Sequence, residues 1–344
     1  MNIADKYCDH ISIWEKELKA WIPDEIFDAH VHLGRKTDMS TDFSAERLKN
    51  ALCTFSNMTL GEIKKWYGNL YAGKKITGLF AFPFPLQEMN FIRANEYIFE
   101  IMQIDQGVRG FIWTNPKSIK LTIDVFTNAE RRGVRFAGAK PYYDILGKSN
   151  FDTLMEEILP RQLLKFINSE KLILMLHTTG KGIGDKKVRD YIKSISDYFP
   201  QIKIVLAHMG RHLSVADFEE FMKSELPDNP SVFLETSSSS QVEIYKMVLE
   251  NTQLRKRLLF GSDIPFGLIT GMEKWSETSG AIFKTRDKYA WSESGSYGYA
   301  DLTYNTYHVI KAIKDALESL NLNKNDINKL KNDIFLNNAL VLTL

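Results

Sequence analysis

The sequence predicts an α/β protein of the (β/α)8 TIM-barrel class, with long loops after strands 1 and 8. Two observations lead to this fold. Eight short apolar runs alternate with longer amphipathic stretches, which is typical of parallel strands joined by helices. The runs are rich in Val, Ile, Leu and Phe without strict polar alternation, as in strands covered on both faces. A doubly wound open sheet is the alternative, and the lack of a glycine-rich dinucleotide loop disfavours it.

The predicted strands and helices follow one another along the chain. The strands span residues 26–32, 76–82, 108–113, 134–140, 172–177, 202–208, 232–236 and 258–263. Helical spacing of apolar residues predicts helices at 88–105, 118–132, 185–199 and 214–226. Gly133, Pro200 and Pro227 are predicted helix stops, and Ser214 is a predicted N-cap.

Two connections are too long to be plain turns. Residues 34–75 follow the first strand and are predicted to hold two helices, at 44–58 and 60–71. Residues 264–300 follow the eighth strand and are rich in Gly, Ser, Trp and Tyr. In a barrel both lie on the C-terminal face, where active sites are found, so we expect substrate recognition there.

The composition favours a cytoplasmic protein that acts on a small molecule. The chain has 44 basic and 43 acidic side chains, and this balance disfavours nucleic acid as a partner. No apolar run reaches the ~18 residues of a membrane span, and the charged N-terminus lacks the apolar core of a signal peptide. We expect one domain over residues 1–344, in which strand 1 begins near residue 26 and residues 1–25 form an N-terminal extension.

A histidine pair ends the first predicted strand. His30 and His32 are two residues apart, so their side chains project from the same face of a strand. Two imidazoles on one face near a strand end form half of a divalent-metal site. The alternative for the isolated pair is two hydrogen-bonded core histidines.

Further ligand-type residues end other strands. His177 ends the fifth, His208 the sixth and Asp263 the eighth. Burying these polar groups together would cost several kcal/mol unless a metal or dense hydrogen bonding compensates. Histidine with carboxylate suits zinc or a similar first-row cation better than Mg²⁺ or Ca²⁺.

These strand ends resemble the amidohydrolase superfamily, and within it the amidohydrolase-related branch that includes aminocarboxymuconate semialdehyde decarboxylase and the resorcylate decarboxylases. The motifs GSDIPFG at 261–267 and IFLNNAL at 334–340 extend the similarity, which runs from about residue 26 to the C-terminus. The motif set is specific for the branch and unspecific for the substrate.

The resemblance implies that His30, His32, His177 and Asp263 ligate one divalent metal, zinc or alternatively manganese. It places His208 beside a metal-activated water. Asp263 would then transfer a proton, and His208 would polarise a carbonyl or stabilise negative charge. A homodimer is the assembly expected from the family.

Two residues have more than one interpretation. Asp28 either orients a ligand histidine without binding the metal itself, or caps the barrel interior. The first interpretation is favoured. Lys140, at the end of strand four, is interpreted as a cation beside an acidic substrate group. The alternatives are a carboxylated lysine that bridges two metals, as in binuclear members of the superfamily, and a surface lysine.

Other residues at the predicted barrel mouth are candidate substrate contacts: Arg35, Trp113, Tyr142, Arg211 and Glu235. Arg35, Lys140 and Arg211 together suggest a substrate that carries a carboxylate.

Three functions are compatible with this pattern. The favoured hypothesis is a metal-dependent hydrolase that opens an amide, lactone or related bond of a small carboxylate-bearing substrate through a metal-activated water. The alternative is a non-oxidative, metal-dependent decarboxylase of an aromatic or unsaturated acid. The third is a metal-binding protein without catalytic activity.

Overall fold

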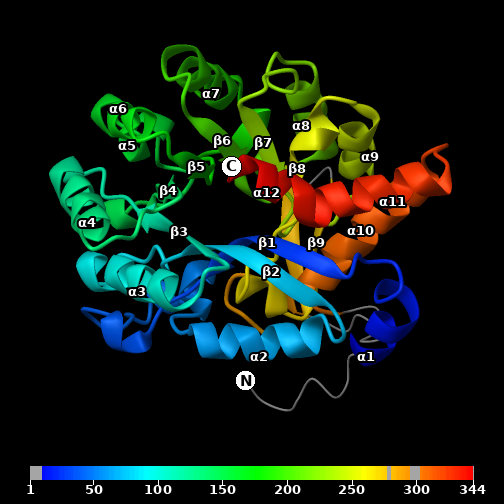
Figure 1. The fold of residues 1–344 in the computed structure, drawn as a ribbon, viewed down its shortest axis with the longest axis horizontal. Helices are drawn as coiled ribbons and strands as arrows, with labels where there is room; N and C mark the ends of the chain where they lie inside the picture. Colours follow the sequence, from blue (N-terminus) through cyan, green and yellow to red (C-terminus); the bar gives the residue numbers. More distant parts are fainter. Residues whose placement is uncertain (1–9, 277–279, 295–302, 344) are drawn as a thin grey trace.

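The computed structural model describes residues 10–276, 280–294 and 303–343. Eight parallel strands follow one another around a barrel in chain order, each paired with the next (Figure 1). They are β1 (Glu25–His32), β2 (Lys75–Phe82), β3 (Val108–Trp113), β4 (Gly138–Lys140), β5 (Ile173–Leu176), β6 (Lys203–Leu206), β7 (Val232–Glu235) and β8 (Leu258–Leu259). Hydrogen bonds such as Ala29 N to Phe260 O, 2.8 Å, join β1 to the segment after β8. The predicted (β/α)8 barrel is confirmed.

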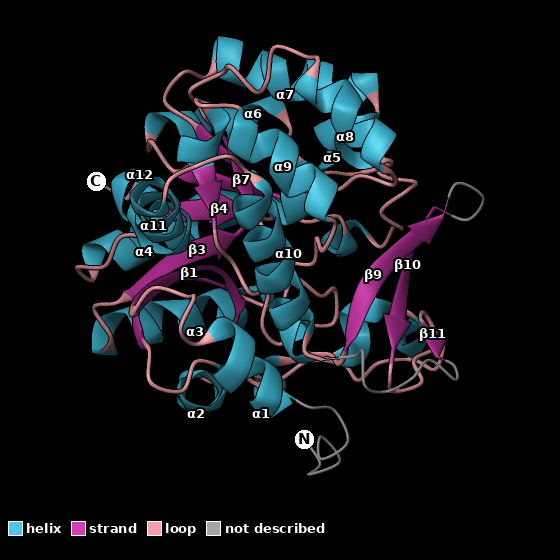
Figure 2. Cartoon of the chain, turned by 90° about the vertical axis from the view of Figure 1, so that its right-hand side faces the viewer, coloured by secondary structure: helices cyan, strands magenta, loops and turns pink. Residues whose placement is uncertain are grey.

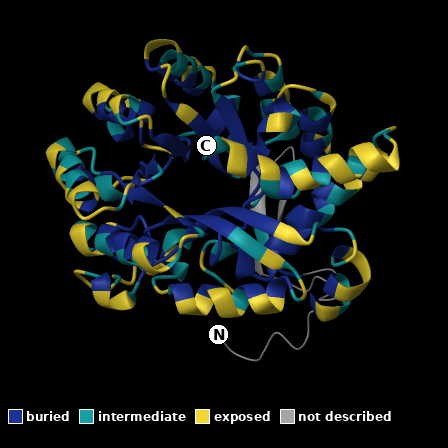
Figure 3. Ribbon diagram, in the orientation of Figure 1, coloured by how far each residue is buried: buried dark blue, intermediate teal, exposed yellow. Residues whose placement is uncertain are grey.

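Helices surround the barrel. They are α1 (His10–Ile13), α2 (Leu60–Leu70), α3 (Phe91–Ile104), α4 (Ile119–Arg131), α5 (Met155–Ile158), α6 (Arg161–Ser169), α7 (Lys186–Tyr198), α8 (Val215–Met222), α9 (Val242–Glu250), α10 (Asn305–Ser319), α11 (Lys324–Asn332) and α12 (Asn338–Leu342). Their inner faces are buried and their outer faces exposed, as the alternating colours of Figure 3 show. None of the described helices is long and apolar enough to cross a membrane.

Several of the predicted helices begin at a residue whose side chain caps the first turn. The Ser214 hydroxyl accepts a hydrogen bond from Asp217 N at the start of α8, which confirms the predicted N-cap. Asp185 caps α7 in the same way. Thr59 and Glu62 form a reciprocal capping box at α2, so the backbone donors of its first turn are satisfied.

The inside of the barrel is filled mainly by aromatic rings. Phe27, Phe80, Phe82 and Phe111 pack against one another with ring centroids 4.9 to 5.0 Å apart. The absence of a side chain at Gly138 makes room for this packing, because a Cβ there would overlap the Phe111 ring and a backbone carbonyl oxygen of β5. The barrel interior is therefore a packed core and not an open channel.

The loop after β1 differs from the prediction. The helix predicted at 44–58 is wrong, because this stretch forms two 3₁₀ turns, Arg47–Lys49 and Ala51–Thr54. The Arg47 guanidinium pairs with both Glu88 and Asp144, which follow β2 and β4, and so ties the loop across the barrel mouth. The helix predicted at 60–71 is confirmed as α2.

The loop after β8 contains structure that the sequence did not predict. Strands β9 (Gly271–Ser276) and β10 (Gly280–Thr285) pair antiparallel, and β11 (Glu293–Ser294) extends their sheet. Figure 2 shows this small sheet standing to one side of the barrel.

Replacing Gly138 by alanine tests the packing inside the barrel. We expect Gly138→Ala to lower the free energy of unfolding by about 1–3 kcal/mol, because the added methyl has no space. Gly68→Ala is the matched control. Gly68 is exposed on α2 with nothing near its missing Cβ, so this change should raise stability by about 0.5–1 kcal/mol. Urea unfolding measures both, and equal effects would contradict the packing argument.

Candidate metal centre and active-site pocket

A pocket opens at the C-terminal ends of the strands. Its volume is about 380 Å³, within the range of small-molecule sites. Residues at or just after the strands line it: His32, Phe84, Lys140, His177, His208, Ser238 and Asp263. Most of the predicted chemistry-bearing residues therefore meet here.

Hydrogen bonds fix the orientation of the two strand-one histidines. His32 Nδ1 lies 2.9 Å from the carbonyl oxygen of Pro83, which can only accept, so Nδ1 of His32 carries the proton. His30 Nδ1 lies 2.8 Å from Oε2 of Glu235. Burial lowers the pKa of His32 to about 3 and that of His30 well below its usual value, so both rings are neutral at pH 7. Each ring therefore directs the bare nitrogen Nε2 away from its partner.

Three acceptor atoms converge at this point. The Nε2 atoms of His30 and His32 are 3.3 Å apart, and Asp263 Oδ1 lies 3.4 and 3.5 Å from them. Asp263 Oδ1 is buried and accepts no hydrogen bond from any described residue. Lone pairs that face one another repel, whereas a cation between them would satisfy all three. The geometry and the donor set therefore fit a divalent metal.

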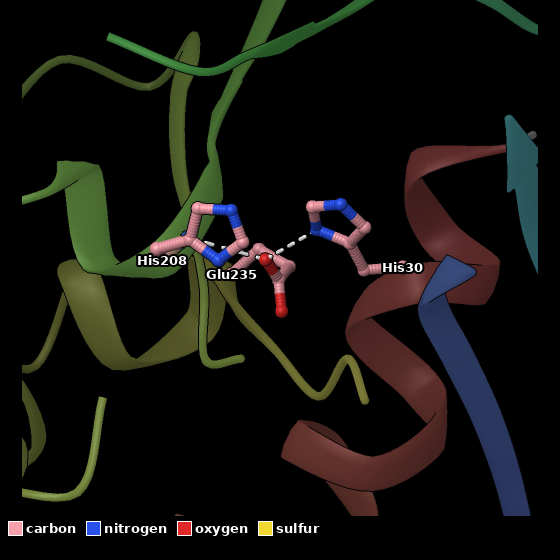
Figure 4. A group of neighbouring side chains, drawn as sticks. All are labelled: His30, His208 and Glu235. Atoms are coloured by element: carbon pink, nitrogen blue, oxygen red, sulfur yellow. Dashed lines mark hydrogen bonds and ion pairs between the residues drawn. The ribbon is translucent and has the colours of Figure 1, made fainter. Parts of the chain in front are cut away.

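A second group of ligand-type atoms involves His30, His208 and Glu235 (Figure 4). In this group Glu235 already accepts hydrogen bonds from His30 Nδ1 and from the backbone N of His208. A metal there would have to break these bonds. The group of His30, His32 and Asp263 is therefore the better candidate metal site.

Lys140 is the cation nearest these groups among the contacts described. Its Nζ lies 3.4 Å from His30 Nε2, and its side chain is buried. Burial lowers the pKa of Lys140 to about 8, while the charges of Asp263 and Glu235 oppose this shift. Lys140 also lines the pocket, so it is no surface lysine.

His177 lies close to this cluster and outside its tightest group. Its ring centroid is 5.3 Å from that of His208 and 4.8 Å from that of Tyr142. Its buried Nδ1 has no hydrogen-bond partner among the described residues. An unsatisfied buried nitrogen beside the cluster is compatible with a ligand role, which stays a prediction.

The backbone turns sharply where two of the predicted residues stand. β6 ends at Leu206, two residues before the predicted end, and His208 lies in the following 3₁₀ turn with φ +55°. Asp263 has φ +55° as well. Such left-handed conformations cost about 1–3 kcal/mol each in residues other than glycine, and they gather at functional sites.

The structure places Asp28 on a different face from the one expected. The register of β1 against β2 shifts between Asp28 and Val31, so simple alternation does not relate Asp28 to His30. The Asp28 carboxylate accepts from the Tyr67 hydroxyl and from the backbone N and hydroxyl of Ser262. It also accepts a hydrogen bond from the backbone N of His30 at 3.2 Å, so its predicted part in orienting that histidine stays a prediction. Asp28 therefore fixes the backbone beside Asp263.

Two candidate substrate contacts lie away from the pocket. The Arg35 guanidinium pairs with Asp38 and Glu100, each at 2.9 Å. Trp113 packs against Phe91 of α3, with ring centroids 5.3 Å apart. Neither lines the pocket. Their positions near strand ends in the sequence do not show that the Arg35 side chain turns toward Asp38 and Glu100, or that the Trp113 side chain turns toward α3.

The other candidate contacts divide into two kinds. Tyr142 and Arg211 line the pocket, and the Arg211 guanidinium donates to the carbonyl oxygen of Thr178 at 2.9 Å. Glu235 is fully buried behind the histidines and does not line the pocket. It is placed to hold His30 and His208, and its contact with a substrate stays a prediction.

Several pocket residues were missed by the sequence reasoning. The aromatic side chains Tyr143, Phe84, Phe266 and Trp291 form much of its wall, and Trp291 comes from the loop after β8. Ser237, which contacts both Glu235 and His208, was also missed. Their signals in the sequence were positions after predicted strands or in the long mouth loops and, for Phe266, a place in the GSDIPFG motif.

Comparison with known proteins agrees with this architecture. A family model described as Amidohydrolase matches residues 83–280, more than half of the chain. No curated protein sequence matches the chain significantly.

Solved structures of similar fold include three enzymes. A dihydroxybenzoic acid decarboxylase from Polaromonas sp. JS666, with bound manganese and the inhibitor 2-nitroresorcinol, has 14% identity and a TM-score of 0.53, covering 93% of this chain and 97% of that one. A 2,6-dihydroxybenzoate decarboxylase from Rhizobium has 13% identity and a TM-score of 0.52, covering 94% and 98%. A 4-oxalomesaconate hydratase from Rhodopseudomonas palustris has 13% identity and a TM-score of 0.51, covering 92% and 95%.

At these identities the structural likeness shows the shared barrel fold. The family model adds a sequence match that includes β3 to β8 and the residues His177, His208 and Asp263. This chain belongs to the amidohydrolase family of enzymes.

Proposed function

We propose that this protein is a metal-dependent decarboxylase that releases CO₂ from a small aromatic or unsaturated carboxylic acid. The observation that carries the proposal is an aromatic-walled pocket, lined by Lys140 and Arg211, in which Lys140 lies beside the candidate metal cluster. The hydrolase hypothesis favoured from the sequence alone becomes the alternative.

The pocket wall suits a flat acid. Phe84, Tyr142 and Phe266 offer apolar and aromatic surface for a ring or a conjugated chain. Lys140 and Arg211 line the same pocket, where either could bind a carboxylate. A cation close to the reacting carboxylate would hold it in place.

The comparisons with solved structures also favour a decarboxylase. Two of the similar structures are decarboxylases of dihydroxybenzoic acids, and the third is a hydratase. The manganese in one of the decarboxylases keeps manganese beside zinc as a candidate for this protein. None of these three enzymes is a hydrolase of an amide or lactone.

His30, His32 and Asp263 would hold the metal, with His177 as the predicted fourth ligand. A divalent metal bound there would polarise a substrate oxygen and stabilise negative charge that develops on the substrate. The chain's own residues supply the rest: Lys140 and Arg211 orient the carboxylate, and the aromatic wall excludes water from the reacting carbon.

The proposed step balances with one proton. The bond between the substrate carbon and its carboxylate breaks, CO₂ leaves, and the electron pair stays on the carbon. The carbon then takes a proton from the Asp263 carboxyl group, which water later protonates again.

Incubation with hydroxybenzoic acids tests the proposed reaction. We expect CO₂ release from at least one 2-hydroxy- or 2,6-dihydroxybenzoate, and a loss of at least about 100-fold in kcat for Asp263→Asn, because this change removes both the proton donor and a metal ligand. Asp190→Asn, on the exposed face of α7, is the control and should keep full activity. Hydrolysis of lactones or amides without any CO₂ release from carboxylic acids would replace this proposal by the hydrolase.

Elemental analysis tests the metal site. The purified protein should contain about one equivalent of zinc or manganese per chain. His32→Ala should leave only a small fraction of that metal, because one converging nitrogen is lost. His212→Gln is the control, since His212 lines the same pocket outside the cluster. Two equivalents of metal would instead favour a carboxylated, bridging Lys140.

The assembly and the domain limits stay predictions. We propose a homodimer of single-domain chains over residues 1–344, with residues 1–25 as an extension of the barrel. Light scattering of the eluted protein measures the mass that checks the dimer.

A further inference from the structure

Glu235 lies at the centre of a hydrogen-bond network behind the pocket. Its Oε2 lies 3.2 Å from the backbone N of His208 and 2.8 Å from the Ser237 hydroxyl. Its Oε1 lies 2.5 Å from the backbone N of Ser237. The two backbone N–H groups can only donate, so both carboxylate oxygens act as acceptors. His30 Nδ1, 2.8 Å from Oε2, is then a further donor.

This arrangement fixes the direction of the next hydrogen bond. The hydroxyl of Ser237 has one hydrogen, and it points to Glu235. The lone pairs of Ser237 Oγ are left for His208 Nδ1, which lies 2.9 Å away. Nδ1 of His208 must therefore carry the ring proton. Nε2 of the neutral ring is then an acceptor.

The acceptor nitrogen is directed away from the network. His208 is half-buried and lines the pocket, while its Nδ1 edge is held by Ser237. Figure 4 shows His208 and His30 on the two sides of the Glu235 carboxylate. The pocket thus receives a hydrogen-bond acceptor at this position. The sequence reasoning expected His208 to polarise a carbonyl, which would need a donor.

We propose that Glu235 and Ser237 are positioning residues that keep the ring proton of His208 on Nδ1, so that Nε2 is the ring nitrogen left for the pocket. This state of His208 does not depend on the proposed function.

Nitrogen NMR tests the state of His208. The zinc-loaded protein is labelled with ¹⁵N-histidine, and a His208→Gln spectrum assigns the signals. We expect His208 Nδ1 to be protonated and Nε2 bare. Ser237→Ala should raise the ratio of the Nε2–H to the Nδ1–H form at least about fivefold, the change that loss of one ordinary hydrogen bond produces.

The controls separate this effect from general disturbance. Ser239→Ala removes a hydroxyl from the same loop that bonds to Gln241 and should leave the His208 signals unchanged. Ser237→Thr keeps the hydroxyl and should restore the wild-type ratio. A protonated Nε2 in the wild-type protein, or identical signals in Ser237→Ala, would overturn the proposal.

Discussion

The convergence of three lone pairs at the barrel mouth is the constraint on which the rest of the site depends. Two imidazole nitrogens and one carboxylate oxygen lie within 3.5 Å of one another in a buried position. Such an arrangement is unfavourable unless a cation occupies the space between them. Hydrogen bonds hold the two rings in this arrangement: His32 Nδ1 bonds to the carbonyl oxygen of Pro83, and His30 Nδ1 bonds to Glu235. Both keep the proton on Nδ1, so both bare nitrogens face the same point.

The closure of the barrel sets the distance between these groups. Asp263 comes from the last strand segment and the histidines from the first, and their backbones meet where Asp263 N donates to His30 O at 2.8 Å. Asp28 reinforces this junction, because its carboxylate binds both the backbone and the hydroxyl of Ser262. Residues more than two hundred positions apart in the chain are thereby held in contact. The motif of β1 and the motif after β8 therefore meet at one place, where hydrogen bonds join them.

Much of this could be predicted from the sequence, and the failures have physical causes. Apolar runs identified all eight strands, and the strand-end histidines and Asp263 could be placed at one mouth because parallel strands end together. The face of Asp28 could not be predicted, because a register shift in β1 breaks the alternation. Arg35 was misplaced because a strand-end position does not say where a long side chain finds its partner. The contacts of Ser237 depend on Glu235 and His208 together, and no spacing in the sequence encodes them.

The ion pairs of Arg47 with Glu88 and Asp144 affect how tightly the pocket can hold a small molecule. By joining Glu88 and Asp144, Arg47 orders the loop whose Asn50 and Leu52 line the pocket before any molecule arrives. The entropy lost in ordering that rim is therefore lost on folding, and an incoming small molecule keeps more of its interaction energy as affinity. The shape of this rim is accordingly set before a molecule binds.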